Sequence, residues 1–293
     1  MWGIKQIKQL LDLSKTMLFY VSQLIESVSS WEYLILNVLG VLVIMAFGYH
    51  AARKNTFTWF SALIYTAGIP LVFLIGIRLA YLFFYADIND PVVHFLDLKL
   101  YGFSLYGGLI LVVVYSVIVA WLSRIPVWNW LDFHGIGVMG YVALGKTGCF
   151  LNGCCFGSPT LMPWGINYAS DSHAYHYYMV QAFNHISSHA WTVYSDRIHP
   201  VQLYEVIIAV ALLITGYLFL RRKVLPGTFF LLCAALYSLA RLGLLFLRAN
   251  PVMGPHFYAL PWLYVTVAGL SVGILLVRLY FQYKSVNRGS RFK

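Results

Sequence analysis

Long apolar stretches separated by short polar segments run along most of the chain. A helix needs about 20 predominantly apolar residues to cross the hydrocarbon core of a bilayer. We therefore predict seven transmembrane helices, at roughly 33–52, 58–85, 102–122, 129–150, 201–220, 226–247 and 258–281. Pro70 predicts a kink in the second. Several glycines between 135 and 148 place the fourth inside the bundle, because glycine lets helices approach closely.

The two ends of the chain differ from this pattern. Residues 1–30 carry apolar residues at nearly helical spacing with lysines between them, which predicts an amphipathic helix on the membrane surface. A poorly ordered terminus is the alternative, and no cleavable signal peptide is evident. We expect an all-α polytopic bundle with three parts: this N-terminal helix (1–30), one seven-span domain (31–283) and a basic cytoplasmic tail (284–293).

One connection is much longer than the others. Residues 151–200 join the fourth and fifth spans, and loops of this length are usually functional or disordered. The segment is rich in Trp, Tyr and His, which does not fit disorder. We expect a small ordered cap over one end of the bundle.

Composition agrees with a membrane protein. Hydrophobic residues make up 60% of the chain, charged residues only 10%, and the mean hydropathy is +0.73. A soluble domain has about a quarter of its residues charged. The formal net charge is +10. Many of the basic residues lie at alternate connections between the predicted spans, at Arg53, Arg124 and Arg221, and in the C-terminal tail. The positive-inside rule assigns these loops to the cytoplasm, so we expect the N-terminus outside, the C-terminus inside and no nucleic-acid partner.

Charged residues within the predicted spans lie near the outer end. Arg78, Lys146 and Arg241 come from three spans, and Glu205 opens a fourth. Intramembrane charges are costly and usually functional. Snorkelling of long cationic side chains from the lipid-facing surface is one interpretation. The other is a pocket for an anionic lipid headgroup that opens to the outer leaflet, since guanidinium and ammonium groups suit a phosphodiester.

The densest motif covers residues 145–157 and reads Gly-Lys-Thr-Gly-Cys-Phe-Leu-Asn-Gly-Cys-Cys-Phe-Gly. It resembles the signature of the prolipoprotein diacylglyceryl transferase family, roughly Gly-Arg-x-Gly-Asn-Phe-x-Asn-Gly-Glu-x-x-Gly. Further elements of that family follow in order over about 31–280. The matching segments are Tyr33, the Gly-x-Arg-x-x-Tyr element at 76–81, the Gly-Gly pair at 107–108, Pro-Trp-Gly at 163–165, Arg-x-His-Pro-x-Gln-Leu-Tyr-Glu at 197–205 and the sixth-span element at 237–248.

Members of this family transfer the diacylglyceryl group of phosphatidylglycerol to the lipobox cysteine of a preprolipoprotein. The resemblance implies this activity, a location in the bacterial cytoplasmic membrane, and phosphatidylglycerol (or another anionic phospholipid) and a preprolipoprotein signal peptide as partners. It gives two sets of candidate residues. The catalytic candidates are Tyr106, Lys146, Arg241, Glu205, Cys149 and Cys154. The substrate-binding candidates are Tyr33, Arg78, Gly107, Gly108, Asn152, Gly157, His199, Gln202, Tyr204 and Arg248.

The sequence departs from the family where the chemistry is expected. Tyr106 replaces a histidine, and a tyrosine with an ordinary pKa near 10 is a poor base at neutral pH. Lys146 replaces an arginine and keeps the charge without the bidentate fork. Cys149 replaces an asparagine and Cys154 a glutamate, while Leu245 takes a position that is acidic in some members.

These cysteines leave three interpretations open. Cys149 could form a disulfide with Cys154 or Cys155 in an oxidising compartment. The cysteines could be inert small residues, or Cys149 and Cys154 could act as thiolate nucleophiles on the lipid. Cys233 lies in mid-span, where we expect it to pack.

Five histidines in the long loop raise the question of a metal site. The pairs His173–His176 and His185–His189 have helical spacing, but no acidic or cysteine partner follows at a familiar ligand spacing. His199 belongs to the family block. We therefore expect neither a metal nor a cofactor. Besides the transferase, two functions stay open: an enzyme with a different acceptor, and a non-catalytic lipid-binding or lipid-moving protein.

Overall fold

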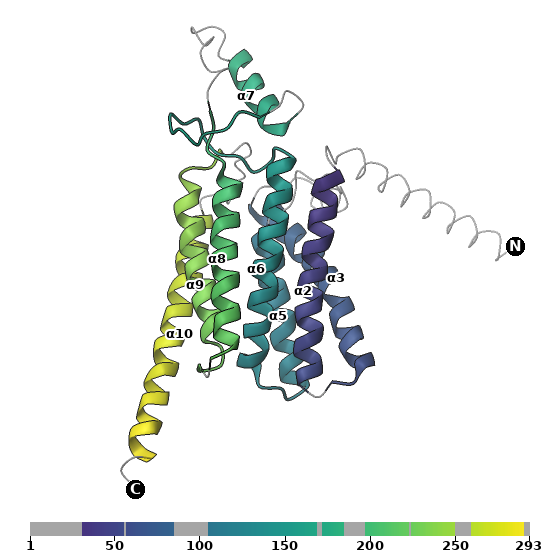
Figure 1. Ribbon diagram of the computed structural model, residues 1–293, viewed down its shortest axis with the longest axis vertical. Helices are drawn as coiled ribbons and strands as arrows, with labels where there is room; N and C mark the ends of the chain where they lie inside the picture. Colours follow the sequence, from purple (N-terminus) through teal and green to yellow (C-terminus); the bar gives the residue numbers. More distant parts are fainter. Residues whose placement is uncertain are drawn as a thin grey trace, which may run out of the picture.

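The computed structural model describes residues 31–55, 57–84, 105–168, 172–184, 197–222, 224–249 and 259–289. These ranges hold eight α-helices (Figure 1). Their bounds are α2 Trp31–Lys54, α3 Trp59–Phe84, α5 Leu105–Leu122, α6 Val127–Leu151, α7 His173–Asn184, α8 Val201–Leu220, α9 Thr228–Leu245 and α10 Ala259–Gly289. The predicted N-terminal amphipathic helix lies outside the described residues.

The predicted helical bundle is confirmed, since each predicted span coincides with a helix, and six of the seven agree with it to within a few residues at both ends. The helices α2, α3, α8, α9 and α10 are each long and apolar enough to cross a membrane, and α5 is a shorter apolar helix. The chain is thus a multi-pass membrane protein. The largest difference is at the C-terminus, where α10 continues through much of the predicted tail to Gly289.

Helix α6 lies at the centre of the bundle. It packs against α2 and α5 on one side and against α8 and α9 on the other (Figure 1). Glycines permit this, as predicted: a Cβ atom on Gly140 would stand 2.7 Å from Val43 Cγ1, and one on Gly40 equally close to the Tyr141 ring. Because α6 is covered on several sides, it can carry polar residues that a lipid-facing helix could not.

A buried polar network lies in the half of the bundle nearer the start of α6. His134 Nδ1 donates to the Trp130 carbonyl oxygen (2.7 Å), which leaves Nε2 as an acceptor facing the Tyr65 hydroxyl. Ser116 Oγ lies 3.0 Å from the same hydroxyl. This network joins α3, α5 and α6. The sequence interpretation, which placed the embedded polar groups near one end of the bundle, missed it.

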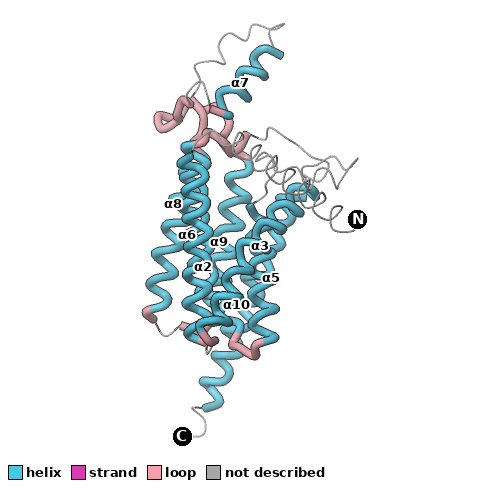
Figure 2. Tube along the Cα trace, turned by 90° about the vertical axis from the view of Figure 1, so that its right-hand side faces the viewer, coloured by secondary structure: helices cyan, strands magenta, loops and turns pink. Residues whose placement is uncertain are grey.

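The segment between α6 and α8 covers the end of the bundle where α6 finishes and α8 begins, which we call the cap end (Figure 2). Its described part consists of an irregular stretch, 152–168, and helix α7. A small cluster of Phe156, Ala174 and Ile198 forms its core. Isolated backbone bridges join Ile198 to Pro159 and Ile166, and Gly157 to Arg248 after α9. The loop is therefore ordered over these residues because it is tied to the starts and ends of three helices.

Candidate functional site

One buried carboxylate organises the polar groups near the cap end. Glu205, in the first turns of α8, has only 1% of its surface exposed. Its Oε1 atom accepts from Lys146 Nζ of α6 at 3.0 Å and from Arg241 Nη1 of α9 at 2.6 Å. Its Oε2 atom accepts from the Tyr237 hydroxyl at 3.2 Å. Three helices that are distant in sequence thus meet at one carboxylate, and both of its oxygens are engaged.

The cluster carries excess positive charge. Lys146 and Arg241 face a single anion, and Arg248 acts electrostatically on the same carboxylate. Lys146, Arg241 and Glu205 together therefore carry one net positive charge. Burying charge without a counter-charge is costly, so a site of this kind favours an anionic ligand. Phosphate oxygens satisfy guanidinium and ammonium donors well.

Burial decides between the two interpretations of the intramembrane cations. Arg78 and Lys146 are 5% and 4% exposed, and the Arg241 side chain is 12% exposed. Snorkelling side chains reach the headgroups from a lipid-facing surface, whereas these lie inside the bundle. Arg78 also packs its guanidinium 5.3 Å from the Tyr81 ring centroid on its own helix. Its contact with a phosphate stays a prediction.

Aromatic side chains form one wall of the cluster. The Tyr106 hydroxyl of α5 hydrogen-bonds with Ser238 Oγ of α9. Its ring stacks with Tyr237 at 6.4 Å and meets Tyr264 of α10 edge-on at 5.0 Å. Arg241 Nη2 donates to the Tyr264 hydroxyl at 3.2 Å. Tyr106 is thus joined to the cation cluster through α9 and α10, at the position where the family signature has histidine.

Gln202 links the first turn of α8 to the loop after α6. Its Nε2 donates to the Cys154 carbonyl oxygen (2.7 Å) and to the Tyr168 hydroxyl (2.8 Å). The residue is fully buried, and its Oε1 atom has no hydrogen-bond partner among the described residues. Buried acceptors normally find a donor. A contact of this oxygen with a substrate hydroxyl or thiol stays a prediction.

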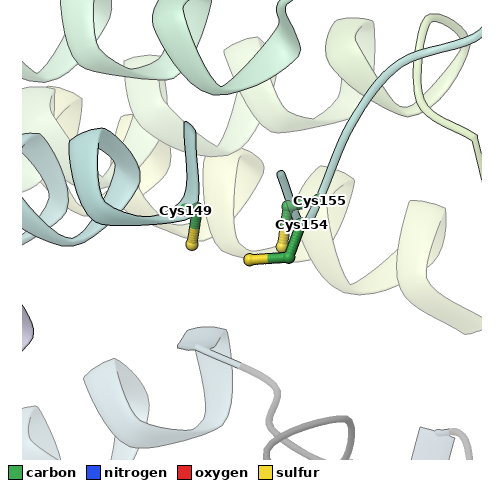
Figure 3. A group of neighbouring side chains, drawn as sticks. All are labelled: Cys149, Cys154 and Cys155. Carbon is green, nitrogen blue, oxygen red and sulfur yellow. The ribbon is translucent and has the colours of Figure 1, made fainter. Parts of the chain in front are cut away.

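Three cysteines converge beside this cluster (Figure 3). The sulfur atoms of Cys149, Cys154 and Cys155 all lie within 4.8 Å of one another. All four cysteines of the chain are free thiols, so the structure does not contain the disulfide that was one of our three interpretations. Hydrogen bonds from the Cys149 and Cys154 thiols, together with the charges of Arg248 and Lys146, hold the pKa of Cys155 well below its usual value.

The block around His199 ties the cap to the bundle. His199 Nδ1 lies 3.1 Å from the Tyr204 hydroxyl, which also accepts from Trp164 Nε1 at 2.8 Å. The Gly157 amide donates to the His199 carbonyl oxygen, and a Cβ atom on Gly157 would stand 2.5 Å from that oxygen. These residues also contact other parts of the cap, since the Tyr178 hydroxyl donates to the Gly157 carbonyl oxygen at 2.8 Å and the His199 amide donates to the Ser158 carbonyl oxygen. Their contact with a substrate stays a prediction.

The remaining candidates lie on α2, α5 and α6. Gly107 and Gly108 pack directly against α3, where a Cβ atom on Gly108 would stand 2.5 Å from Ile77 Cγ2. The structure therefore gives the Gly-Gly pair a packing role at the level of Arg78. The Tyr33 carbonyl oxygen accepts from Asn37 Nδ2, and Asn152 is the buried residue that caps the C-terminal end of α6.

Sequence reasoning assigned no role to several residues of the site, namely Tyr168, Tyr237, Ser238 and Tyr264. Tyr237 had a usable signal, since it precedes Arg241 by one helical turn and so shares its face. Tyr264 had none, because its place depends on how α10 packs. Of the loop histidines, His173 and His176 lie on α7, whereas His185 and His189 lie outside the described residues.

Comparison with known proteins points in the same direction. The family described as prolipoprotein diacylglyceryl transferase matches residues 21–282. Three proteins named phosphatidylglycerol–prolipoprotein diacylglyceryl transferase illustrate the similarity. The one from Wolbachia pipientis is 31% identical over 147 residues, 47% of this chain and 54% of that protein. The one from Nostoc is 30% identical over 182 residues, 59% and 57% of the two chains. The one from Tropheryma whipplei is 24% identical over 181 residues, 60% of each.

Fold and site together define a class: a multi-pass helical membrane protein with a buried, positively charged cluster beneath a cap. Within this class, the chain belongs to the prolipoprotein diacylglyceryl transferase family, since the match covers most of its length. It spans about half the length of the curated relatives that it matches.

Proposed function

We propose that this protein transfers the diacylglyceryl group of phosphatidylglycerol to the thiol of a lipobox cysteine in a preprolipoprotein. The observation that carries the proposal is the pair of buried cations sharing Glu205 Oε1, with positive charge left over for a phosphate. Phosphatidylglycerol has one phosphodiester charge, and the relatives named above are called phosphatidylglycerol–prolipoprotein diacylglyceryl transferases. Both the charge and the names support this donor.

In the proposed reaction the peptide sulfur attacks the glyceryl carbon that bears the phosphate oxygen. A carbon–sulfur bond forms, the carbon–oxygen bond breaks, glycerol phosphate leaves, and the thiol proton is lost. Charge increases on the phosphate as the bond breaks, so fixed cations stabilise the transition state more than the ground state. Glu205 and Tyr264 hold Arg241 in place before the lipid binds, which reduces the cost of reorganisation.

Glu205 acts as a positioning residue in this scheme. Two cations and the Tyr237 hydroxyl occupy its oxygens, which leaves it poorly placed to remove a thiol proton. The Tyr106 hydroxyl is engaged with Ser238. Thiol activation therefore needs another source.

We further propose that the protein lies in the bacterial cytoplasmic membrane with the cap end facing outward. Basic residues lie in the last turn of α2 and shortly after α5 and α8, at the opposite end of these helices from the cap, and α10 ends on that side too (Figure 1). By the positive-inside rule that end is cytoplasmic. The N-terminus is then outside, the C-terminus inside, and the lipid enters from the outer leaflet. The division into 1–30, 31–283 and 284–293 belongs to this proposal.

A reconstituted assay tests the transfer. Proteoliposomes containing labelled phosphatidylglycerol are mixed with a lipobox peptide, and the peptide mass and released glycerol phosphate are measured. We expect a gain of one diacylglyceryl group on the cysteine peptide and none on its Cys→Ser counterpart. Arg241→Gln should lower the transfer rate by about 100-fold or more, since it removes a transition-state donor. Arg222→Gln, an exposed cation at the opposite end, is the matched control.

The departures from the family motif favour a second candidate, an enzyme of the same scaffold with a different acceptor. Tyr106 and Cys154 stand where the family has histidine and glutamate. Consumption of labelled phosphatidylglycerol without any lipobox peptide would support that candidate. Lipid binding with no turnover of either kind would contradict both and support a lipid-binding protein.

A further inference from the structure

Cys149, Cys154 and Cys155, which we call the cysteine cluster, have no role in the transfer scheme proposed above. Cys149 ends α6 in its last turn, and Cys154 and Cys155 belong to the loop that follows (Figure 3). The Cys154 amide donates to the Cys149 carbonyl oxygen at 3.0 Å, which closes the loop. Gly153 and Cys155 have φ angles of +64° and +60°. A cysteine rarely adopts this left-handed conformation, so the backbone is constrained in a way that brings the three sulfurs together.

We propose that Cys149, Cys154 and Cys155 bind one Zn²⁺ ion. A Zn–S distance of about 2.3 Å with near-tetrahedral angles places ligand sulfurs about 3.8 Å apart. The observed sulfurs lie within 4.8 Å of one another, so side-chain rotations would bring them to this spacing without moving the backbone far. Thiolates are soft ligands that favour Zn²⁺ over Mg²⁺ or Ca²⁺.

The charge around the cluster fits a trithiolate zinc centre. Three thiolates and one Zn²⁺ carry a net charge of minus one. Lys146 and Arg248 act electrostatically on Cys155, so cations already surround the sulfurs. The zinc centre would therefore be opposite in charge to the neighbouring group of Lys146, Arg241 and Glu205, which carries one net positive charge. In metalloproteins, charged groups and hydrogen-bond donors next to the ligands orient these ligands and strengthen metal binding.

Three protein ligands leave the fourth position of a tetrahedral zinc ion open, as in catalytic rather than structural sites. The group of ligand atoms found among the described residues consists of these three sulfurs. Resting on the proposed function, we assign the fourth position to the thiol of the incoming peptide. Binding to zinc would release the thiol proton to solvent and keep the sulfur as a thiolate. This would supply the activation that Tyr106 and Glu205 do not provide.

Metal binding is tested without any transfer assay. The full-length protein in detergent is reduced, stripped with a chelator and titrated with Zn²⁺, and bound zinc is counted per chain. We expect one ion for the wild type and for Cys233→Ala, a buried cysteine outside the cluster. Alanine at Cys149, Cys154 or Cys155 should weaken binding by about 100-fold or more, because loss of a ligand costs at least as much as loss of its supporting contacts.

Other outcomes would overturn the site. Wild-type protein that binds no zinc, or cluster variants that bind as tightly as Cys233→Ala, would contradict it. Unreduced protein that shows two reactive thiols instead of four, together with no zinc binding after reduction, would show that the cluster is a disulfide pair with a third thiol.

The fourth position has its own readout. In Co²⁺-substituted protein, the lipobox cysteine peptide should intensify and shift the thiolate-to-cobalt bands, while its Cys→Ser counterpart should not. A stable metal site that does not respond to the peptide would overturn the assignment of the peptide thiol but not the metal site. Metal binding in a protein without transferase activity would contradict the proposed function alone.

Discussion

Glu205 shows what a single residue contributes to this site. Lys146 and Arg241 are buried in the membrane-embedded bundle, and their positions depend on one shared carboxylate oxygen. Without the carboxylate, two like charges would face each other where water is scarce. The residue therefore has a structural task, holding the cations, on which the proposed chemistry depends.

This gives a prediction about stability. Glu205→Gln should destabilise the protein by about 3–5 kcal/mol, because removing one partner of a buried ion pair leaves the other charges uncompensated. The midpoint of unfolding in detergent measures the change. Glu32→Gln, an exposed position in the first turn of α2, should leave the midpoint nearly unchanged. Equal stability of both variants would show that the Glu205 carboxylate does not hold the two cations.

At the scale of elements, glycines determine which helices pack closely together. Gly76 on α3 and Gly107 on α5 bring two backbones into contact beside Arg78, and the glycines of α6 do the same against α2. Some glycines have no such task. Gly243 on α9 has open space where a Cβ atom would stand. Position in the bundle, and not the residue type, decides which glycines matter.

We predict that a glycine-to-alanine substitution has opposite effects on stability at Gly107 and at Gly243. Gly107→Ala should destabilise by about 1–3 kcal/mol, because its Cβ atom would overlap Ala80 and the Gly76 carbonyl oxygen and force the helices apart. Gly243→Ala should be neutral or stabilising by up to about 1 kcal/mol, since alanine is the better helix former. Unfolding in detergent distinguishes them, and equal effects would contradict the close α3–α5 contact.

At the scale of the whole molecule, the two ends of the bundle differ in two ways: one is covered by the cap, and the other carries more basic residues. The cap lies at one end, and basic residues lie in the last turn of α2 and shortly after α5 and α8 at the other. This asymmetry orients a membrane protein through its loop charges. The same orientation would place the cation cluster near the outer leaflet.

Topology reporters test this orientation. A reporter active only outside the cytoplasm should work when inserted in the cap between 185 and 196, and fail when fused to the C-terminus. A fluorescent reporter that matures only in the cytoplasm should behave in the reverse way. Activity of the first reporter at the C-terminus would invert the orientation and place the candidate site on the cytoplasmic side.

The sequence by itself determined that the protein is a bundle of long apolar helices and the order of these helices, because crossing hydrocarbon demands long apolar segments that are visible as such. It also pointed to Lys146, Glu205 and Arg241, because a charge in an apolar segment is expensive and therefore noticeable. The family motif identified the same residues independently. For these features the relevant physics is local to the segment.

Only the tertiary structure decided which of these groups share a partner. Nothing in the spacing of 146, 205 and 241 indicates that one oxygen of Glu205 accepts from both cations. Tyr264 and the His134–Tyr65 network escaped sequence reasoning for the same reason. The three sulfurs converge through a left-handed turn at Cys155 that its residue type does not favour. Contacts of this kind arise from helix packing and loop closure, which join residues distant in the chain and leave no periodic pattern within it.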